Sequence, residues 1–194
     1  MSLSELAFEN PHSGTRVRVV SADEEAGRSF VVEYVAAPGN TRAVVFPHRH
    51  ESWVEHFEVL DGHARYRVAE AEGELSTGET VEVPPQVVHT HPWNAGASEL
   101  RVRQTTTLLK PDPAAIRDTL HGFAMLAWLA REGRVDERGR PSLLQGAVIQ
   151  ESMQRHGGSL PGLPVPLQRA LIRVLAALGR RRGYVACDPA ALAT

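Results

Sequence analysis

The sequence predicts a mainly β fold, an antiparallel sandwich or barrel, followed by a helical extension. Up to about residue 109, short β-rich stretches alternate with clusters of Gly, Pro, Asn and Asp. Asp61-Gly62 lies between two of these stretches, which is a strong hairpin signal. After Pro111 and Pro113, apolar residues recur with the period of an α-helix. We therefore expect a β domain over residues 1–109 and a helical extension over residues 110–194.

Each element is expected from its own pattern. The β-rich stretches are residues 15–20, 30–36, 43–46, 54–60, 64–68, 80–83 and 100–109. A helix is expected over residues 114–131, with Asp112 as its N-cap and Gly133 past its end. A weaker helix is expected over residues 141–154. Residues 167–178 predict an amphipathic helix, because apolar residues recur there three, four, seven and eight positions apart.

Composition limits the class of protein. The 194 residues, 42% hydrophobic and 23% charged, are ordinary for a soluble globular chain. The net charge of −2 gives no reason to expect nucleic acid as a partner. Cys187 is the only cysteine, which excludes an internal disulfide. No signal peptide or membrane-spanning run is visible, so we expect a cytoplasmic protein. The basic segment 167–182 could lie on a membrane, but a helix docked on the protein is favoured.

Six of the nine histidines lie between residues 48 and 91. Histidine is the commonest protein ligand of transition metals. On a strand, His48 and His50 point to the same face. Val44 and Phe46 would share that face, so we expect it to be the interior of the barrel.

Glu55 follows shortly, ahead of a β-rich run whose Phe57 and Val59 share its face. A third imidazole must come from a neighbouring strand, and His89 is the candidate, on one face with His91. Burying several imidazoles and a carboxylate without a shared partner would be costly. We therefore expect one metal ion among these side chains.

Two motifs resemble the cupin family. The first is His48-Arg49-His50, four residues, Glu55, six residues and Gly62; the second is Gly78, Pro84, His89 and Asn94. Arg42 and Gln86 stand where the motifs usually have Gly, and Asn94 comes one residue late. The resemblance covers roughly residues 30–106. It implies a jelly-roll barrel with a metal inside, bound by His48, His50, Glu55 and His89.

Other side chains near the motifs are assigned by their position. His56 and His63 are expected to face solvent by strand alternation. Tyr66 and Gln104 are expected to point inward, where packing or structural hydrogen bonding is favoured over substrate contact. Trp53 and Trp93 flank the ligand segments and either line a cavity mouth or pack ordinarily.

The expected cofactor is one divalent transition-metal ion, because three imidazoles and a carboxylate suit Fe, Mn, Ni, Cu or Zn. The resemblance implies a metal-dependent protein that acts on a small organic molecule, with an Fe(II)-type dioxygenase as the first candidate. Glu55 and His91 are the candidate catalytic groups.

Two alternatives stay open. One is a non-catalytic module that senses or stores a metal or small ligand; the other is a sugar or keto-acid isomerase, which would need inward Lys or Arg. An open mouth beside the metal would favour an enzyme, and a sealed cavity would favour a binding module. We also expect a homodimer, because edge strands and apolar helix faces need cover.

Overall fold

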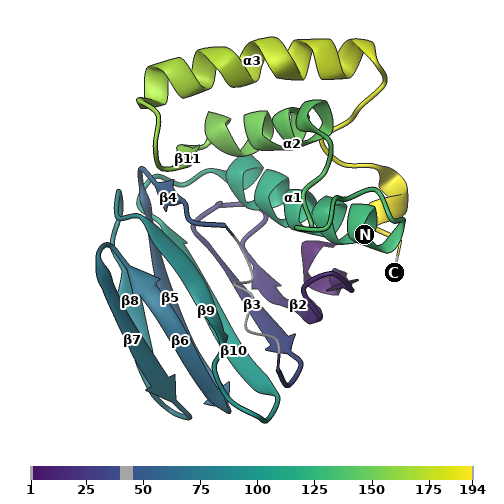
Figure 1. The fold of residues 1–194 in the computed structure, drawn as a ribbon. Coiled ribbons are helices and arrows are strands. Elements are labelled where there is room, and N and C mark those ends of the chain that lie inside the picture. The colour runs from purple at the N-terminus through teal and green to yellow at the C-terminus, as the bar shows by residue number, and fades with distance from the viewer. Residues whose placement is uncertain (1, 40–45, 194) are drawn as a thin grey trace.

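The fold is a β-barrel with helices stacked on it, as seen in a computed structural model that describes residues 2–39 and 46–193. The larger sheet has the order β1-β2-β3-β10-β5-β8, the smaller has the order β7-β6-β9, and β4 pairs with β11. Neighbouring strands are antiparallel throughout. Figure 1 shows α1 against the strands, α2 above it and α3 outermost. The mainly β fold with a helical extension is confirmed.

The strands are mostly short. The larger sheet contains β1 (Ala7–Asn10), β2 (Thr15–Ala22), β3 (Ser29–Ala36), β10 (Leu100–Leu108), β5 (Trp53–Asp61) and β8 (Thr80–Val83). The smaller sheet contains β7 (Ala71–Ser76), β6 (His63–Val68) and β9 (His89–Asn94). The two-residue strands are β4 (Arg49–His50) and β11 (Gly158–Ser159).

The helices begin and end where local signals place them. They are η1 (Leu3–Glu5), α1 (Pro113–Arg131), α2 (Leu143–Arg155), α3 (Val165–Arg181) and η2 (Pro189–Ala191). The Asp112 carboxylate accepts a hydrogen bond from the Ala115 N–H, which makes it the N-cap of α1. Gly133 follows the helix with φ +65°, a conformation that glycine adopts without strain. No helix in the described part of the chain is long and apolar enough to span a membrane.

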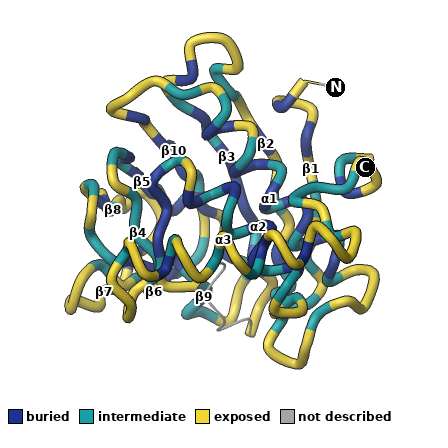
Figure 2. The backbone as a smooth tube through the Cα atoms, turned by 90° about the horizontal axis from the view of Figure 1, so that it is seen from above, coloured by how far each residue is buried: buried dark blue, intermediate teal, exposed yellow. Residues whose placement is uncertain are grey.

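Alternation along β5 explains how the barrel interior is built. Trp53, Glu55, Phe57 and Val59 are buried, whereas the residues between them are partly exposed. The carboxylate therefore lies on the same face as the core, as the sequence indicated. Figure 2 shows α3 as the outer layer, with exposed turns in front of the more deeply buried strands.

The segment before His48 differs from its expected structure. Phe46 was expected inside the barrel, but 59% of its surface is exposed and it lies outside any strand. Pro47 follows, and backbone pairing begins only at His48. Proline has no N–H to donate to a ladder, so the strand cannot run through it unbroken. Val44 and the rest of the expected strand at 43–45 lie outside the described residues.

Candidate metal centre

Five side chains that the sequence singled out meet inside the barrel. His48, Glu55, His89 and His91 each offer one ligand atom, and these atoms lie within 4.8 Å of one another. His50 lies beside this group, with its Nε2 3.8 Å from Oε1 of Glu55. The residues come from the loop before β4, from β4, from β5 and from β9, so the barrel closure is what assembles them.

A backbone bridge holds two of the imidazoles together. The N–H of His48 donates to the carbonyl of His89 at 3.0 Å, and the N–H of His89 donates back to the carbonyl of His48 at 2.9 Å. The two rings are 4.3 Å apart between centroids. Because the bridge is reciprocal, the two backbones cannot separate without breaking both hydrogen bonds, so the Cα atoms that carry the two imidazoles stay side by side.

The same two histidines present their Nε2 atoms to the centre. Nδ1 of His48 is 2.8 Å from the carbonyl oxygen of Phe46, and Nδ1 of His89 is 3.0 Å from that of Val87. A carbonyl oxygen only accepts, so each Nδ1 carries the proton and donates it. In the neutral ring each Nε2 then keeps a lone pair, which is the arrangement a metal-binding imidazole needs.

Glu55 is held by a neighbour on β10. Nε2 of Gln104 donates to Oε1 of Glu55 at 2.8 Å and to the hydroxyl of Thr106 at 3.0 Å. All three side chains are buried. Oε2 of Glu55 remains, 2.6 Å from Nε2 of His89. Gln104 therefore points inward and makes structural hydrogen bonds.

Several buried polar atoms at the centre have no hydrogen-bond partner among the described residues. They are Nδ1 and Nε2 of His50, Oε2 of Glu55, Nε2 of His89 and Nε2 of His91. The short contact between Glu55 and His89 lacks hydrogen-bond geometry, since both of its atoms are in this set. An unpaired buried polar group costs about 1–3 kcal/mol. A cation could be shared by one nitrogen of each imidazole and by Oε2 of Glu55, which would leave only the second ring nitrogen of His50 unpaired.

Burial and the Glu55 charge set the protonation of the cluster. Burial lowers the pKa of His48, lowers that of His50 to about 3, and lowers that of His91 well below its ordinary value. Burial acts the same way on His89, but the contact with Glu55 outweighs it and raises the pKa. For Glu55, burial favours the neutral acid, yet His50 and the other imidazoles outweigh it and lower the pKa. These directions favour an ionised Glu55 and neutral His48, His50 and His91, whereas the contact with Glu55 favours the protonated form of His89.

His50 packs differently from the other histidines. Its ring stacks on Trp53 with centroids 4.2 Å apart and planes inclined by 11°. Trp53 itself belongs to the apolar core with Phe30 and Leu108. Trp53 therefore packs in the core, and in doing so it fixes the plane of the His50 imidazole.

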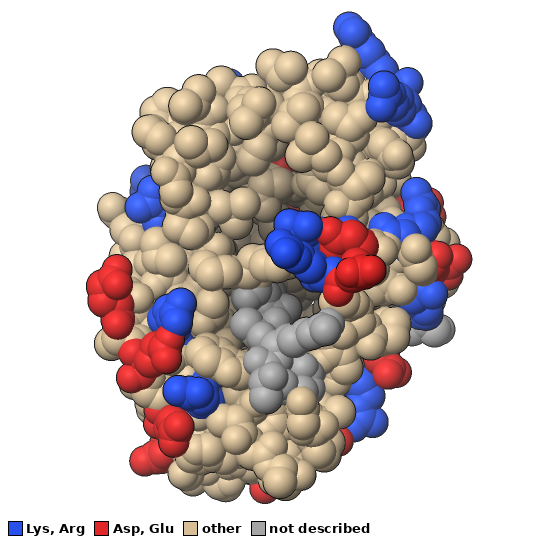
Figure 3. Space-filling view, in the orientation of Figure 1, with Lys and Arg blue, Asp and Glu red and all other residues tan. Residues whose placement is uncertain are grey.

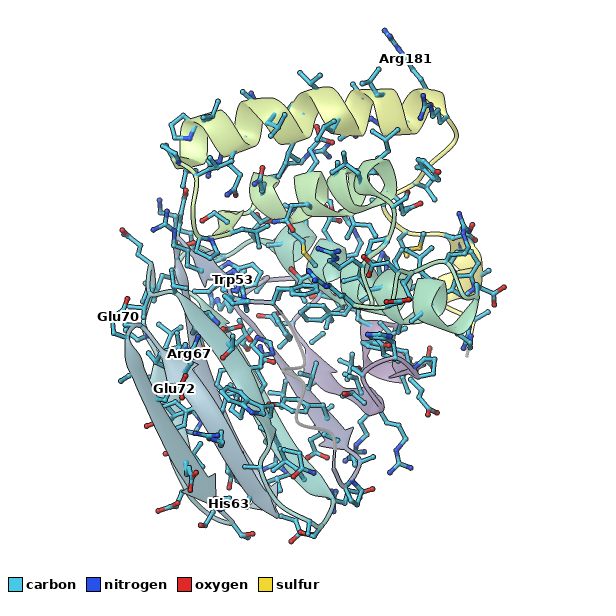
Figure 4. All side chains as sticks on the ribbon, viewed as in Figure 1. Trp53, His63, Arg67, Glu70, Glu72 and Arg181 are labelled. Atoms are coloured by element: carbon cyan, nitrogen blue, oxygen red, sulfur yellow. The ribbon has the colours of Figure 1, made fainter. Side chains whose placement is uncertain are left out.

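The remaining candidates lie away from the centre. His63 lies near Glu74, with 3.1 Å between Nε2 and the carboxylate, and Figure 4 shows it at the opposite end of the barrel from Trp53. His56 alternates outward on β5 and is half-buried. Tyr66 packs against the second core cluster, and Trp93 is half-buried on β9.

The donor set fits a transition-metal ion. Imidazole nitrogen and carboxylate oxygen together suit Fe, Mn, Ni, Cu and Zn, and no thiolate contributes, since the only cysteine, Cys187, lies between α3 and η2 in the helical extension. The tautomers of His48 and His89 and the hydrogen bond from Gln104 are the outer contacts that orient such ligands. The residues therefore could hold one ion; its identity stays open.

Comparison with known proteins identifies the barrel. Residues 32–107 match the family model of the cupin domain. This segment contains all five residues of the cluster. The similarity to the cupin domain therefore covers the barrel, which is less than half of the chain. No curated protein matches the sequence.

The solved structures that the chain matches cover only part of it. The Cnp3 cupin domain of Schizosaccharomyces pombe is 12% identical over 48% of this chain and 64% of its own, with a TM-score of 0.40. The protein TT1209 from Thermus thermophilus is 25% identical over 56% of this chain and 95% of its own, with a TM-score of 0.44. A predicted oxalate decarboxylase from Thermotoga maritima is 18% identical over 56% and 97%, with a TM-score of 0.46.

Proposed function

We propose that this protein binds one divalent transition-metal ion through His48, His50, Glu55 and His89 and acts there on a small organic molecule. The observation that carries the proposal is the set of buried, unpaired donor atoms at the centre, where His48, Glu55, His89 and His91 are close enough to share one ion and His50 lies beside them. Leaving all of them unsatisfied would cost several kcal/mol, on the order of the whole stability of a domain. A bound cation removes most of that cost, because it takes one nitrogen of each imidazole that it binds.

By distance, His91 belongs to the close group of donor atoms and His50 lies beside it. The cupin motifs favour His50, and its two unpaired ring nitrogens support that choice. We assign His91 to the space beside the ion. Its Nε2 is 3.9 Å from Oε1 of Glu55, and its ring also lines an adjoining pocket.

An enzyme is favoured over a storage module because that pocket reaches the cluster. A bound ion would supply Lewis-acid and, for iron, redox chemistry. Gln104 holds one oxygen of Glu55 in place, so the other oxygen can accept a proton from a bound molecule. An Fe(II)-type dioxygenase remains our first candidate. An isomerase is less favoured, since the sole lysine, Lys110, lies beyond the end of β10.

The test combines metal content with reactivity. Protein purified without an affinity metal column should contain close to one first-row metal ion per chain by elemental analysis. His50→Ala should lose tight binding, whereas His63→Ala, at the far end of the barrel, should keep full occupancy. Full occupancy in His50→Ala would refute that ligand.

Oxygen consumption over a panel of enols, thiols and catechols then separates the functions. A dioxygenase should consume oxygen with one class, and Glu55→Gln should lower turnover per bound metal by about two orders of magnitude or more. A binding module should consume none, and the same variant should change only its affinity for the metal. A cytoplasmic location and a homodimer are parts of the proposal that need their own measurements.

A further inference from the structure

A pocket lies between the barrel and the first helix of the extension. Its walls come from β1, β2 and β3 on one side and from Phe123, Leu126 and Ala127 of α1 on the other. Its volume is about 70 Å³. On the face seen in Figure 3, the surface is hollowed between the helices and the strands below them.

The inner end of this pocket reaches the metal centre. His91 and Gln104 both line it, and these are two of the side chains around Glu55: Gln104 donates to one carboxylate oxygen, and His91 lies 3.9 Å from the same oxygen. A molecule in the pocket would therefore touch the immediate surroundings of the ion.

The rest of the lining is mainly apolar. Phe8, Val17 and Val32 of the sheet face Phe123 and Leu126 of α1. The hydroxyl of Tyr34, a polar group in the wall, already donates to the carbonyl of Pro92 at 2.8 Å. The pocket therefore offers mainly contact with hydrocarbon, and its polar lining comes from Asn10, Ser13 and Thr15 around the turn between β1 and β2 and from His91 and Gln104 at the metal centre.

We propose that this pocket takes the apolar body of the substrate, with the polar head directed toward His91, Gln104 and the metal. α1 is then the specificity element. This inference rests on the proposed function and narrows its substrate to a small molecule with one polar end and a short hydrocarbon body. A site for one water needs about 10–15 Å³, so about 70 Å³ limits that body to a few heavy atoms.

Straight-chain carboxylates from acetate to heptanoate test the inference. They bind to protein loaded with cobalt(II), and its visible absorption reports the affinity. Each buried methylene contributes about 0.8 kcal/mol, or about fourfold in affinity. We expect this gain for the first few methylenes and none afterwards, because the pocket is then full.

Variants of α1 should change the gain in affinity per methylene and should not change the binding of the carboxylate head group. Ala127→Leu narrows the pocket, so it should abolish the gain while acetate binds within about twofold of wild type. Phe123→Ala enlarges the pocket and should extend the gain to longer chains. Ala177→Leu, at an exposed position of α3, is the control and should match wild type. The inference would be overturned if all four proteins showed the same gain in affinity per methylene. It would also be overturned if the wild type bound acetate but gained no affinity with longer chains.

An experiment with xenon tests the proposed pocket independently of the proposed metal site. Xenon binds small apolar cavities without a metal. If the protein binds neither metal nor acetate, the proposed function fails, and xenon NMR of the metal-free protein decides the pocket. A saturable xenon shift that Ala127→Leu removes supports it, and equal shifts in the two proteins overturn it.

Discussion

The backbone of Gly158, in the helical extension, pairs with that of His50 at the metal centre. Ser159 pairs with Arg49 in the same short ladder, and Nε of Arg49 donates to the Ser159 hydroxyl at 3.1 Å. The N–H of Glu51 donates to the carbonyl of Gly157 at 3.1 Å. The extension thus adds a strand to the segment that carries two of the histidines, so it holds part of the site in place.

Gly157→Ala should weaken metal binding. Gly157 has φ +88°, which strains any residue with a Cβ, and the added Cβ would lie 3.1 Å from Cβ of Glu51. This strain would disturb the pairing of β11 with β4, the strand that contains His50. We expect an affinity loss of about 10- to 100-fold, the usual effect of disturbing contacts that orient ligands, measured by competition with a chelator.

Gly162→Ala is the matched control for that experiment. Gly162 also has a positive φ, +106°, but a Cβ there would meet nothing within 4 Å. Both variants should lose about 1 kcal/mol of stability, from the backbone alone. Only Gly157→Ala should lose metal affinity. Equal affinities in the two variants would show that β11 does not support the site.

Gln104→Ala should also reduce metal affinity, because it removes the donor that positions the Glu55 carboxylate. The expected loss is about tenfold or more. Gln145→Ala is the control, since Gln145 is buried and donates to the carbonyl of Val185 at 2.8 Å, in the helical extension. Isothermal titration with zinc compares them. If Gln145→Ala loses as much affinity for zinc as Gln104→Ala, the loss comes from general destabilisation and not from the contact with Glu55.

The cluster could be predicted from the sequence because its residues lie in two compact motifs. Alternation places Glu55 inside β5, and two-residue spacing brings His89 and His91 to one face. The position of Phe46 could not be predicted this way, since alternation was extended through a segment that is not a strand.

The pairing of Gly158 with His50 joins residues more than a hundred positions apart, so no local pattern in the sequence predicts it. The pocket under α1 likewise depends on where the helix docks on the sheet. Both features follow from tertiary packing, which the periodicity of a single segment does not encode.

Removal of metal should destabilise the wild-type protein. A ligand that binds only the folded state adds stability by mass action, about 4 kcal/mol at a thousandfold excess over its Kd. EDTA should therefore lower the melting temperature of the wild type by several degrees. It should leave that of His50→Ala unchanged. Scanning calorimetry with and without EDTA measures both, and an EDTA effect of the same size in the variant would contradict the ligand assignment.

A homodimer through α3 is expected because one face of this outer helix is apolar and exposed. Leu167, Leu171, Val174 and Leu178 form the stripe. Leu171→Glu combined with Val174→Glu should convert a dimer to a monomer, as measured by light scattering at tens of micromolar. Leu143→Glu, at a leucine with 71% exposure outside α3, should remain dimeric.

A monomeric wild type would contradict this expectation. The stripe is flanked by Arg173 and Arg181, and residues 165–182 contain no acidic residue. A monomer that sediments with vesicles of anionic lipid would therefore assign the stripe to a membrane surface instead.

Glu33 on β3 lies directly between two arginines on neighbouring strands. It pairs in register with Arg18 of β2 and Arg103 of β10. Arg18 donates to Oε2 at 2.8 Å, and Arg103 donates to Oε1 at 2.9 Å. Hydrogen bonding by Arg18 lowers the pKa of Glu33, burial opposes this, and Arg103 lowers the pKa further.

The lowered pKa of Glu33 predicts a loss of stability in acid. A carboxyl group whose pKa is lower in the folded than in the unfolded state binds more protons when unfolded, so stability falls as the pH drops from its ordinary pKa toward the folded value. Glu33→Gln should therefore lose about 1 kcal/mol at pH 7, since both arginines are largely exposed. The difference from wild type should shrink from pH 5 to pH 3. Urea unfolding across this range measures it, with Glu9→Gln, an exposed position on β1, as the control. A difference that stays constant down to pH 3 would show that the two arginines do not stabilise the Glu33 charge.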